Sequence, residues 1–355
     1  MMQMETKVHP HDFSLPSSLN ASSPPERRGL RRDQVKMMVL DRETGNVVHD
    51  KFIQIEKYFN SGDILVLNNS RTIPAILKGT WHRNGKVIGT NIEMRLARKK
   101  NDSVWEVLIV ATNVKSGDCF KFSETLEANV IGEVFKSPLK LIQFNLQGID
   151  LYNEIYSMGD PIRYEYIHHP WNLDYYQTVF ASQPGSVEMP SAGRAFSWEL
   201  LLKLQQKGVK LAFLQLHTGL SYLLDDEYAH SPEENFEEYS IRQEDMEAIV
   251  KAKDSGAKVI AAGTTVVRAL ETAVINSTTQ GWTNLYITSD FKLQVVDGII
   301  TGFHEPKASH LDMLSAFVDE IKLLEAYNIA IEQKYLWHEF GDINLIIKMK
   351  DGRGQ

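Results

Sequence analysis

The sequence predicts an α/β protein whose core is a mixed, partly parallel sheet with helices, interrupted by a small inserted β-domain. Two observations carry this prediction. The C-terminal half alternates extended and helical stretches, as in AKVIAAGTT followed by VVRALETAV, which is typical of a partly parallel sheet. Residues 79–148 instead contain short β-rich runs separated by turns, which indicates a small barrel or sandwich. We therefore expect a core domain of residues 1–78 and 149–355 and an inserted domain of residues 79–148.

Before the insertion, the pattern predicts an irregular arm, a hairpin, a helical segment and a buried strand. Residues 14–32 are rich in Ser, Pro and Arg and lack periodicity. The runs VKMMVL and VVHDKF flank a turn at 41–46, which predicts a hairpin. A helical stretch over 53–59 then leads to the apolar run ILVL, which ends in polar residues.

After the insertion, helices and strands alternate. Ser197 is a plausible N-cap for the helix WELLLKLQQK, which Gly208 should end. Strands are expected at VKLAFLQLH, at AKVIAA and at LYITSDF, the last covering residues 285–291. Ser309 and Asp312 resemble a capping box that opens a helix over 310–324. Its expected buried stripe consists of Leu311, Leu314, Val318 and Ile321.

Composition indicates a globular protein of a reducing compartment. The 43% hydrophobic and 24% charged residues exclude a disordered chain. Cys119 is the single cysteine, which excludes an intramolecular disulfide and favours a cytoplasmic location. The first twenty residues lack the apolar stretch of a secretory signal, and no apolar run approaches the roughly 18 residues of a membrane span. We expect no membrane association.

The charge distribution leaves room for a local nucleic-acid contact. The net charge of −8 argues against a protein that coats nucleic acid nonspecifically. The densest basic run lies in the N-terminal arm, and a second one, RLARKK, covers residues 95–100. The arm is either a solvated loop or a patch that contacts phosphates. The basic residues of the arm are Arg27, Arg28, Arg31, Arg32 and Lys36.

Several familiar motifs are missing from the sequence. It contains no GxGxxG, GxxxxGK[ST], HExxH or GxSxG pattern. These are the signature motifs of dinucleotide-binding, P-loop, zincin and serine-hydrolase proteins, so the sequence gives no support to those functions. The eleven histidines are scattered, and most are expected to be structural. We expect no metal.

Polar and glycine residues gather where predicted strands end. Asn68 and Arg71 follow ILVL, the triplet His217-Thr218-Gly219 follows LAFLQL, and Gly263-Thr264-Thr265 follows KVIAA. Because ligands of open α/β sheets bind beyond the carboxyl ends of the strands, these segments are expected to wall one pocket. The last triplet also begins a helix, so it either binds an anion or a ribose hydroxyl or serves only as a Thr N-cap.

Other candidate contacts lie on the neighbouring segments. Arg268, one turn into that helix, can clamp a carboxylate or pair with Glu271. The segment 184–196 is a long loop of small residues, which is either a ligand-binding loop or a surface connection. Its candidate contacts are Ser186, Ser191 and Gly193. Just upstream, Tyr176 and Gln177 can stack on and hydrogen-bond a purine base, although such tyrosines are often core residues.

Seven collinear blocks resemble the S-adenosylmethionine:tRNA ribosyltransferase-isomerase family of queuosine biosynthesis. They span nearly the whole chain. The blocks are MVLDRETGNVVHDKF, GDILVLNNSRTIPA, YYQTVFASQPGSVEMPSAG, GVKLAFLQLHTGL, VIAAGTTVVRALE, FHEPKASHLDML and FGDINLII.

The resemblance implies a two-domain α/β protein with an inserted β-barrel. It also implies that the ribosyl part of S-adenosylmethionine is transferred and isomerised onto the 7-aminomethyl-7-deazaguanine base at the tRNA wobble position, giving epoxyqueuosine, adenine and methionine. S-adenosylmethionine is then a consumed substrate, and no cofactor is expected. The expected partners are tRNA and S-adenosylmethionine, with the chain acting as a monomer.

We assign candidate roles to the residues present for the chemistry that the resemblance implies. His217 and His304, the latter beside Lys307, are the candidate bases, with a structural role as the alternative for each histidine. Arg268 and the Gly263–Thr265 turn are expected to hold the methionine carboxylate or ribose hydroxyls. Asn68 belongs to the substrate-binding set, and Arg71 is expected to neutralise a phosphate or orient the acceptor base. The arm and RLARKK would contact the tRNA.

The chain departs from the commoner family form at several positions. Ala195 and Asn235 stand at two His positions, and Leu336 stands at an Arg position. The HVGLGTF segment, which an Arg-Pro pair follows in the family, is replaced by HTGLSYL. Two alternative functions follow: a noncatalytic relative that binds RNA or a nucleoside, and an enzyme with the same sulfonium chemistry but a small-molecule acceptor.

Overall fold

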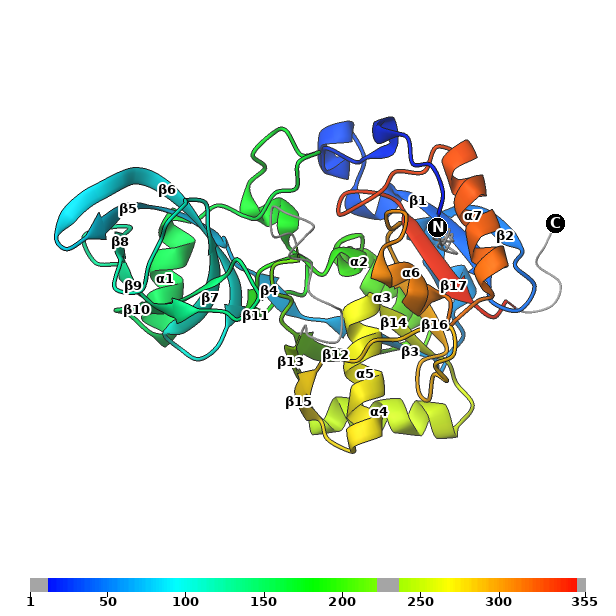
Figure 1. The fold of residues 1–355 in the computed structure, drawn as a ribbon. Coiled ribbons are helices and arrows are strands. Elements are labelled where there is room, and N and C mark those ends of the chain that lie inside the picture. Colours follow the sequence, from blue (N-terminus) through cyan, green and yellow to red (C-terminus); the bar gives the residue numbers. More distant parts are fainter. Residues whose placement is uncertain (1–11, 222–235, 350–355) are drawn as a thin grey trace, which may run out of the picture.

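The computed structural model, which describes residues 12–221 and 236–349, contains a nine-stranded mixed sheet and a closed six-stranded barrel on opposite sides of the molecule (Figure 1). The order of strands in the large sheet is β15-β13-β12-β3-β14-β16-β17-β1-β2. This arrangement confirms the predicted fold class. The strands of the large sheet are β1 (Lys36–Asp41), β2 (Val47–Lys51), β3 (Ile64–Asn68), β12 (Lys210–Leu216), β13 (Glu237–Ile241), β14 (Val259–Ala262), β15 (Gln280–Thr283), β16 (Gly298–Thr301) and β17 (Ile343–Ile347).

Parallel pairing is concentrated in the middle of the large sheet. Strand β3 pairs in parallel with β12 on one side and with β14 on the other, and β14 continues in parallel to β16. Every residue of β3 and β14 is buried, as expected for strands covered on both faces. The predicted hairpin is confirmed by the antiparallel pairing of β1 with β2.

Helices cover both faces of the large sheet. On one face, α3 (Trp198–Gln206) and the 3-10 helix η4 (Phe52–Tyr58) pack on Leu65 and its neighbours. On the other, α4 (Gln243–Asp254), α5 (Thr264–Asn276) and α7 (Glu320–Glu332) pack on a core that includes Val66. The predicted N-cap of α3 is confirmed, since the Ser197 side chain accepts a hydrogen bond from the Leu200 amide. Gly208 follows with φ +89, a conformation that favours glycine.

The barrel has its own apolar core, to which the helix α1 (Gly148–Met158) adds Leu151 and Ile155. That residues 79–148 form a separate inserted domain stays a prediction. The barrel strands are β5 (Ile76–Arg83), β6 (Lys86–Lys99), β7 (Val104–Ile109), β8 (Cys119–Lys121), β9 (Glu127–Glu133) and β10 (Lys140–Phe144).

Short elements link the barrel to the large sheet. Strand β4 (Ser70–Thr72) continues from β3 and pairs in parallel with β11 (Gln183–Ser186), and the single-turn α2 (Ser191–Arg194) follows. The arm and a later segment form 3-10 turns. These are η1 (Ser17–Leu19), η2 (Pro25–Arg28), η3 (Arg32–Gln34) and η5 (Leu173–Tyr176).

The predicted strand at 285–291 is wrong. The edge strand is β15, and the chain after it is irregular. Side chains form hydrogen bonds with the backbone of this segment: the Leu285 amide donates to the Thr283 hydroxyl, and the Leu285 carbonyl accepts from Arg268. Because these groups are engaged with side chains, they do not continue the strand ladder.

The predicted single helix over 310–324 is also wrong. The chain forms α6 (Ser309–Leu314) and, after a turn, α7, whose N-cap Asp319 accepts from the amides of Ile321 and Lys322. That cap begins a new helix and leaves Ile321 69% exposed, outside the buried stripe. The expected capping box is absent, because the N-cap of α6 is Ala308. Asp312 instead accepts a hydrogen bond from the Tyr286 hydroxyl. Among the described residues, no helix has both the length and the apolarity to span a membrane.

Candidate functional site

A pocket of about 700 Å³ lies at the carboxyl ends of the central parallel strands. Two of the three predicted strand-end segments line it directly, through Thr218-Gly219 and Gly263–Thr265. The third contributes Asn68, which lies behind the pocket wall. The other predicted residues that line it are Tyr176, Ser191, Arg268 and His304. The pocket thus collects residues from β14, α5 and the loops after β11, β12 and β16.

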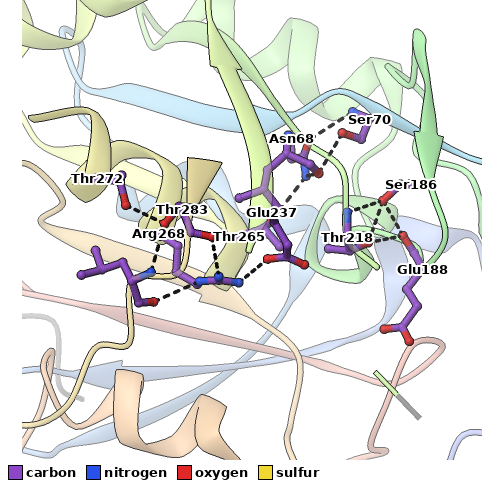
Figure 2. A network of polar contacts seen from close by, with 12 residues as sticks. Asn68, Ser70, Ser186, Glu188, Thr218, Glu237, Thr265, Arg268, Thr272 and Thr283 are labelled. Atoms are coloured by element: carbon purple, nitrogen blue, oxygen red, sulfur yellow. Dashed lines mark hydrogen bonds and ion pairs between the residues drawn. The ribbon is translucent and has the colours of Figure 1, made fainter. Parts of the chain in front are cut away.

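Asn68 holds two of the strand ends together (Figure 2). Its side-chain Nδ2 donates to the carbonyl oxygen of Leu216 at 2.9 Å, and its Oδ1 accepts from the Ser70 amide at 3.0 Å. Nδ2 also lies 3.5 Å from the Thr265 hydroxyl oxygen at the start of α5. Asn68 is buried and positions the pocket wall from behind.

Ser186 and Thr218 fix the small-residue loop against the end of β12. Their hydroxyl oxygens lie 2.7 Å apart, and each lies 2.8 Å from the Glu188 carbonyl oxygen (Figure 2). The Thr218 amide donates to the Ser186 hydroxyl. This arrangement places the Glu188 side chain beside the pocket.

The first turn of α5 forms another part of the wall. Gly263 is the N-cap with φ +106, and neither threonine caps the helix with its side chain. Thr264 and Thr265 line the pocket at the positive end of the helix dipole, which favours an anionic group. The simple Thr N-cap that the sequence left open is therefore not found.

Arg268 forms an ion pair with Glu237 (Figure 2). Its guanidinium also donates to the carbonyl oxygens of Leu285 at 3.1 Å and Thr283 at 3.5 Å. Glu271, the alternative partner considered from the sequence, accepts hydrogen bonds from the amides of residues 294–296. Arg268 is thus fixed on the pocket wall with its charge balanced by Glu237.

His304 lines the pocket as a buried imidazole. Its Nε2 lies 2.8 Å from the Thr301 hydroxyl oxygen, and its ring stacks on His310 with centroids 4.4 Å apart. Burial, and after it the neighbouring histidines, lowers the pKa of His304 well below its ordinary value. The ring is therefore neutral at neutral pH and able to accept a proton. Lys307 lies outside the pocket lining and pairs with Asp12 at 3.2 Å.

His217 lies outside the set of residues that line the pocket. Its ring packs against Gly185, where an added Cβ would lie 3.0 Å from ring atoms. Burial, and after it the charge of Lys99, lowers the pKa of His217 to about 4. The Nδ1 atom is buried and has no hydrogen-bond partner among the described residues.

The remaining predicted contacts have local partners. The Gln177 side chain bonds the amide and carbonyl of Thr72, and the exposed Arg71 lies over the Tyr156 ring at 5.4 Å. Two glycines allow close packing. An added Cβ would lie 3.0 Å from the Phe180 ring at Gly193 and 2.8 Å from the Ala97 carbonyl oxygen at Gly219.

The basic residues of the arm contact the protein itself. Arg28 donates to the carbonyls of Ser23 and Phe340, and Arg31 makes two hydrogen bonds to Asp33. The others are held by a carboxylate, a carbonyl or an aromatic ring. Arg27 lies over Trp171 and Tyr175, Arg32 pairs with Glu26, and Lys36 donates to the carbonyls of Gln333 and Lys334. In the RLARKK run, Arg95, Arg98, Lys99 and Lys100 each pair with an acidic side chain.

The pocket residues that were not predicted from the sequence include Tyr164, Tyr166, Glu188 and Glu339. The Tyr166 hydroxyl donates to Glu339, and burial raises the pKa of Glu339 to about 7. These residues come from three distant segments without a shared motif. The segments that carry them, PIRYEY, HEF and SVEMP, match none of the catalytic motifs considered.

Of the positions that depart from the commoner family form, Thr218 and Ser221 of the HTGLSYL segment line the pocket, whereas Ala195 and Leu336 lie apart from the lining. Ala195 belongs to the apolar core beneath the large sheet, and Leu336 packs in a small cluster near Phe340. Asn235 lies outside the described residues.

Comparisons with known proteins agree along nearly the whole chain. Residues 8–346 match the model of the family described as Queuosine biosynthesis protein. The chain is 38% identical to the S-adenosylmethionine:tRNA ribosyltransferase-isomerase of Acetivibrio thermocellus, over 96% of this chain and 99% of that protein. It is 36% identical to the enzyme of the same name from Carboxydothermus hydrogenoformans, over 96% of this chain and all of that protein. A crystal structure of S-adenosylmethionine tRNA ribosyltransferase from Thermotoga maritima has a TM-score of 0.54 and 29% identity, covering 96% of this chain and all of that one.

Proposed function

Because the chain belongs to the queuosine biosynthesis protein family, whose relatives are transferase-isomerases, we propose that it modifies tRNA with S-adenosylmethionine. The reaction transfers and isomerises the ribosyl moiety onto a 7-aminomethyl-7-deazaguanine wobble base, and releases adenine and methionine. S-adenosylmethionine is consumed as a substrate. We place this activity in the cytoplasm, without a further cofactor.

The observation that best supports the proposal is the pocket itself. Its volume of about 700 Å³ falls within the range of roughly 300–1,000 Å³ typical of small-molecule sites. Its walls combine the positive end of α5, the fixed Arg268–Glu237 pair and the neutral His304. The α5 end suits an anionic group of the substrates, the Arg268–Glu237 pair suits a zwitterionic group, and His304 can accept a proton.

The methionine part of S-adenosylmethionine fits the α5 end of the pocket. Its carboxylate would bind at the amides of Thr264 and Thr265, where the helix dipole is favourable. Its ammonium would lie toward Glu237, whose carboxylate Arg268 keeps in place. This placement directs the sulfonium and ribose toward the middle of the pocket.

His304 is the candidate base for the proton beside the sulfonium. A base must reach that proton and be unprotonated at the working pH. The buried ring meets the second condition, and its bond with Thr301 and its stacking on His310 fix its orientation. The adjacent sulfonium acidifies the carbon-bound proton, which offsets the weak basicity of the imidazole.

The test is release of free adenine by the purified protein from S-adenosylmethionine, with and without a tRNA that carries the aminomethyl base. We expect release that requires this tRNA. Binding of S-adenosylmethionine without adenine release would favour a noncatalytic relative, and release without tRNA would favour a small-molecule acceptor. Either result would overturn the proposal.

A further inference from the structure

One corner of the pocket has no role in the steps above. It consists of Tyr164, Tyr166, Glu188 and Glu339, which we call the acidic corner. Tyr166 donates to the Glu339 carboxylate, and Tyr164 lies 3.2 Å from the Ser221 hydroxyl, which itself donates to Glu188 at 2.8 Å. The two tyrosine rings stack in parallel, with centroids 5.8 Å apart. Two carboxyl groups from distant segments are thereby held on the same side of the pocket.

The Tyr176 hydroxyl at this corner is available to a ligand group. Tyr176 is only 4% exposed, and its hydroxyl has no hydrogen-bond partner among the described residues. Tyr176 lines the same pocket, and the charge of Glu339, second only to burial, raises the pKa of its hydroxyl. Buried hydroxyls are nearly always hydrogen-bonded, so a bound group is expected to complete this contact.

The charges around the corner favour a cation. Glu188 and Glu339 form no ion pair with a cationic side chain within the described part of the chain. Arg163 and Arg194 act on the Tyr176 hydroxyl from outside the pocket lining, and Arg194 is paired with Glu26. The two arginines that line the pocket are occupied by other carboxylates, Arg98 by Glu106 and Arg268 by Glu237. A positively charged ligand group would therefore find two carboxylates and a hydroxyl oxygen as acceptors.

We propose that the acidic corner binds the protonated aminomethyl group of the acceptor base, and that the Glu339 carboxylate takes a proton from it. This inference rests on the proposed function. A primary ammonium has three N–H donors, which match Glu188, Glu339 and the Tyr176 oxygen. A sulfonium has no N–H donor. The methionine ammonium carries an adjacent carboxylate, which two glutamates would repel, so it fits the α5 end better.

The proton transfer leaves a nucleophile in place. One N–H bond of the ammonium breaks and one O–H bond forms on Glu339, giving a neutral amine and a neutral carboxylic acid. The pKa of Glu339, raised to about 7 by burial, suits this exchange near neutral pH. The titratable groups that face Glu339 are Tyr164, Tyr166, Tyr176, Glu188, Glu305 and the neighbouring His338.

Calorimetry with two free bases tests the corner without relying on turnover. The probes are 7-aminomethyl-7-deazaguanine and 7-ethyl-7-deazaguanine, which replaces the ammonium by a methyl group. We expect the wild-type protein to bind the amine about tenfold more tightly or better, and Glu339→Gln and Glu188→Gln to bring the two affinities close together. Tyr176→Phe, which removes one oxygen, should weaken amine binding with little effect on the ethyl probe. Glu332→Gln, an exposed carboxylate outside the pocket, is the matched control and should retain the wild-type preference.

Steady-state kinetics separates the corner from the S-adenosylmethionine site. We expect Glu339→Gln to raise KM for the tRNA and lower kcat, with KM for S-adenosylmethionine unchanged. Equal binding of both probes by the wild-type protein, or a raised KM for S-adenosylmethionine alone, would overturn the proposal. If the wild-type protein released no adenine but preferred the amine through Glu339, the proposed function would fail while the cation site stood.

Discussion

Arg268 and Glu237 join helix α5 to the first residue of β13 through an ion pair on the pocket wall, with side chains 16% and 5% exposed. Removing one partner of a buried pair leaves an uncompensated charge. We expect Arg268→Ala to lower the free energy of unfolding by about 3–5 kcal/mol, measured by urea denaturation. Lys121→Ala is the control, because the side chains of Lys121 and its partner Glu127 are 55% and 42% exposed. Similar losses in both variants would contradict the buried role of the pair.

The two candidate bases differ in where they lie. His304 lines the pocket, whereas His217 packs against Gly185 outside the lining. We expect His304→Gln to lower kcat for adenine release by about 10²–10⁴, the usual range for a lost general base, with the Kd for S-adenosylmethionine unchanged. His217→Gln should reduce kcat much less. A larger loss in His217→Gln, with the protein still folded, would assign the base to His217.

Acidification should destabilise the protein through His338. Burial lowers the pKa of this imidazole from 6.5 to about 4, and its side chain is 8% exposed. Above pH 6.5 the ring is neutral in both states, so no penalty arises. Between pH 6.5 and 4 only the unfolded state takes up the proton, so the free energy of unfolding falls as the pH falls. The total loss reaches about 3 kcal/mol below pH 4.

The variant His338→Asn isolates this effect, since Asn tolerates the left-handed backbone conformation found there, with φ +73. Unfolding free energies of wild type and variant, measured from pH 7 to 4, should differ by an amount that changes in this window. Glu339 contributes with the opposite sign, because its raised pKa adds stability below pH 4.5 that is lost as the pH rises through about 7. A pH-independent difference between wild type and variant would contradict the role of His338.

The arm is predicted to contact tRNA through its exposed cations. Arg27, Arg31 and Lys36 are exposed, whereas Arg28 and Arg32 are half-buried and hold the arm on the protein. Replacing the three exposed residues by Gln should reduce the slope of log K against log salt by about 0.7–0.9 for each phosphate that the arm no longer neutralises. Lys251→Gln, on the exposed side of α4, serves as the control. An unchanged slope in the triple variant would place the tRNA-binding surface elsewhere.

The sequence predicted the parts of the fold that depend on local pattern. Periodicity and turn residues located β3, β12 and β14, and the Ser197 cap located α3. It failed where side chains from distant segments decide the outcome. The side chains of Arg268 and Thr283 form hydrogen bonds with the backbone of Leu285, and Asp319 caps a second helix after α6. Neither interaction has a signature in its own segment.

The site was predictable to the extent that it follows from sheet topology. Strand ends of a parallel sheet must meet, so Thr218, Gly263 and Thr264 were found from the sequence. The same rule did not decide which way a side chain faces, and His217 lies outside the lining. Glu188 and Glu339 escaped prediction because their positions depend on contacts between distant segments, from Tyr166 to Glu339 and from Tyr164 through Ser221 to Glu188.

The most direct test uses S-adenosylmethionine carrying ¹³C in its ribose, incubated with the protein and a tRNA that bears the aminomethyl base. Mass spectrometry of the digested wobble nucleoside then follows the label. Transfer of the ribosyl moiety predicts labelled epoxyqueuosine together with free adenine. An unlabelled nucleoside, or the label recovered only in hydrolysis products, would contradict the proposed reaction.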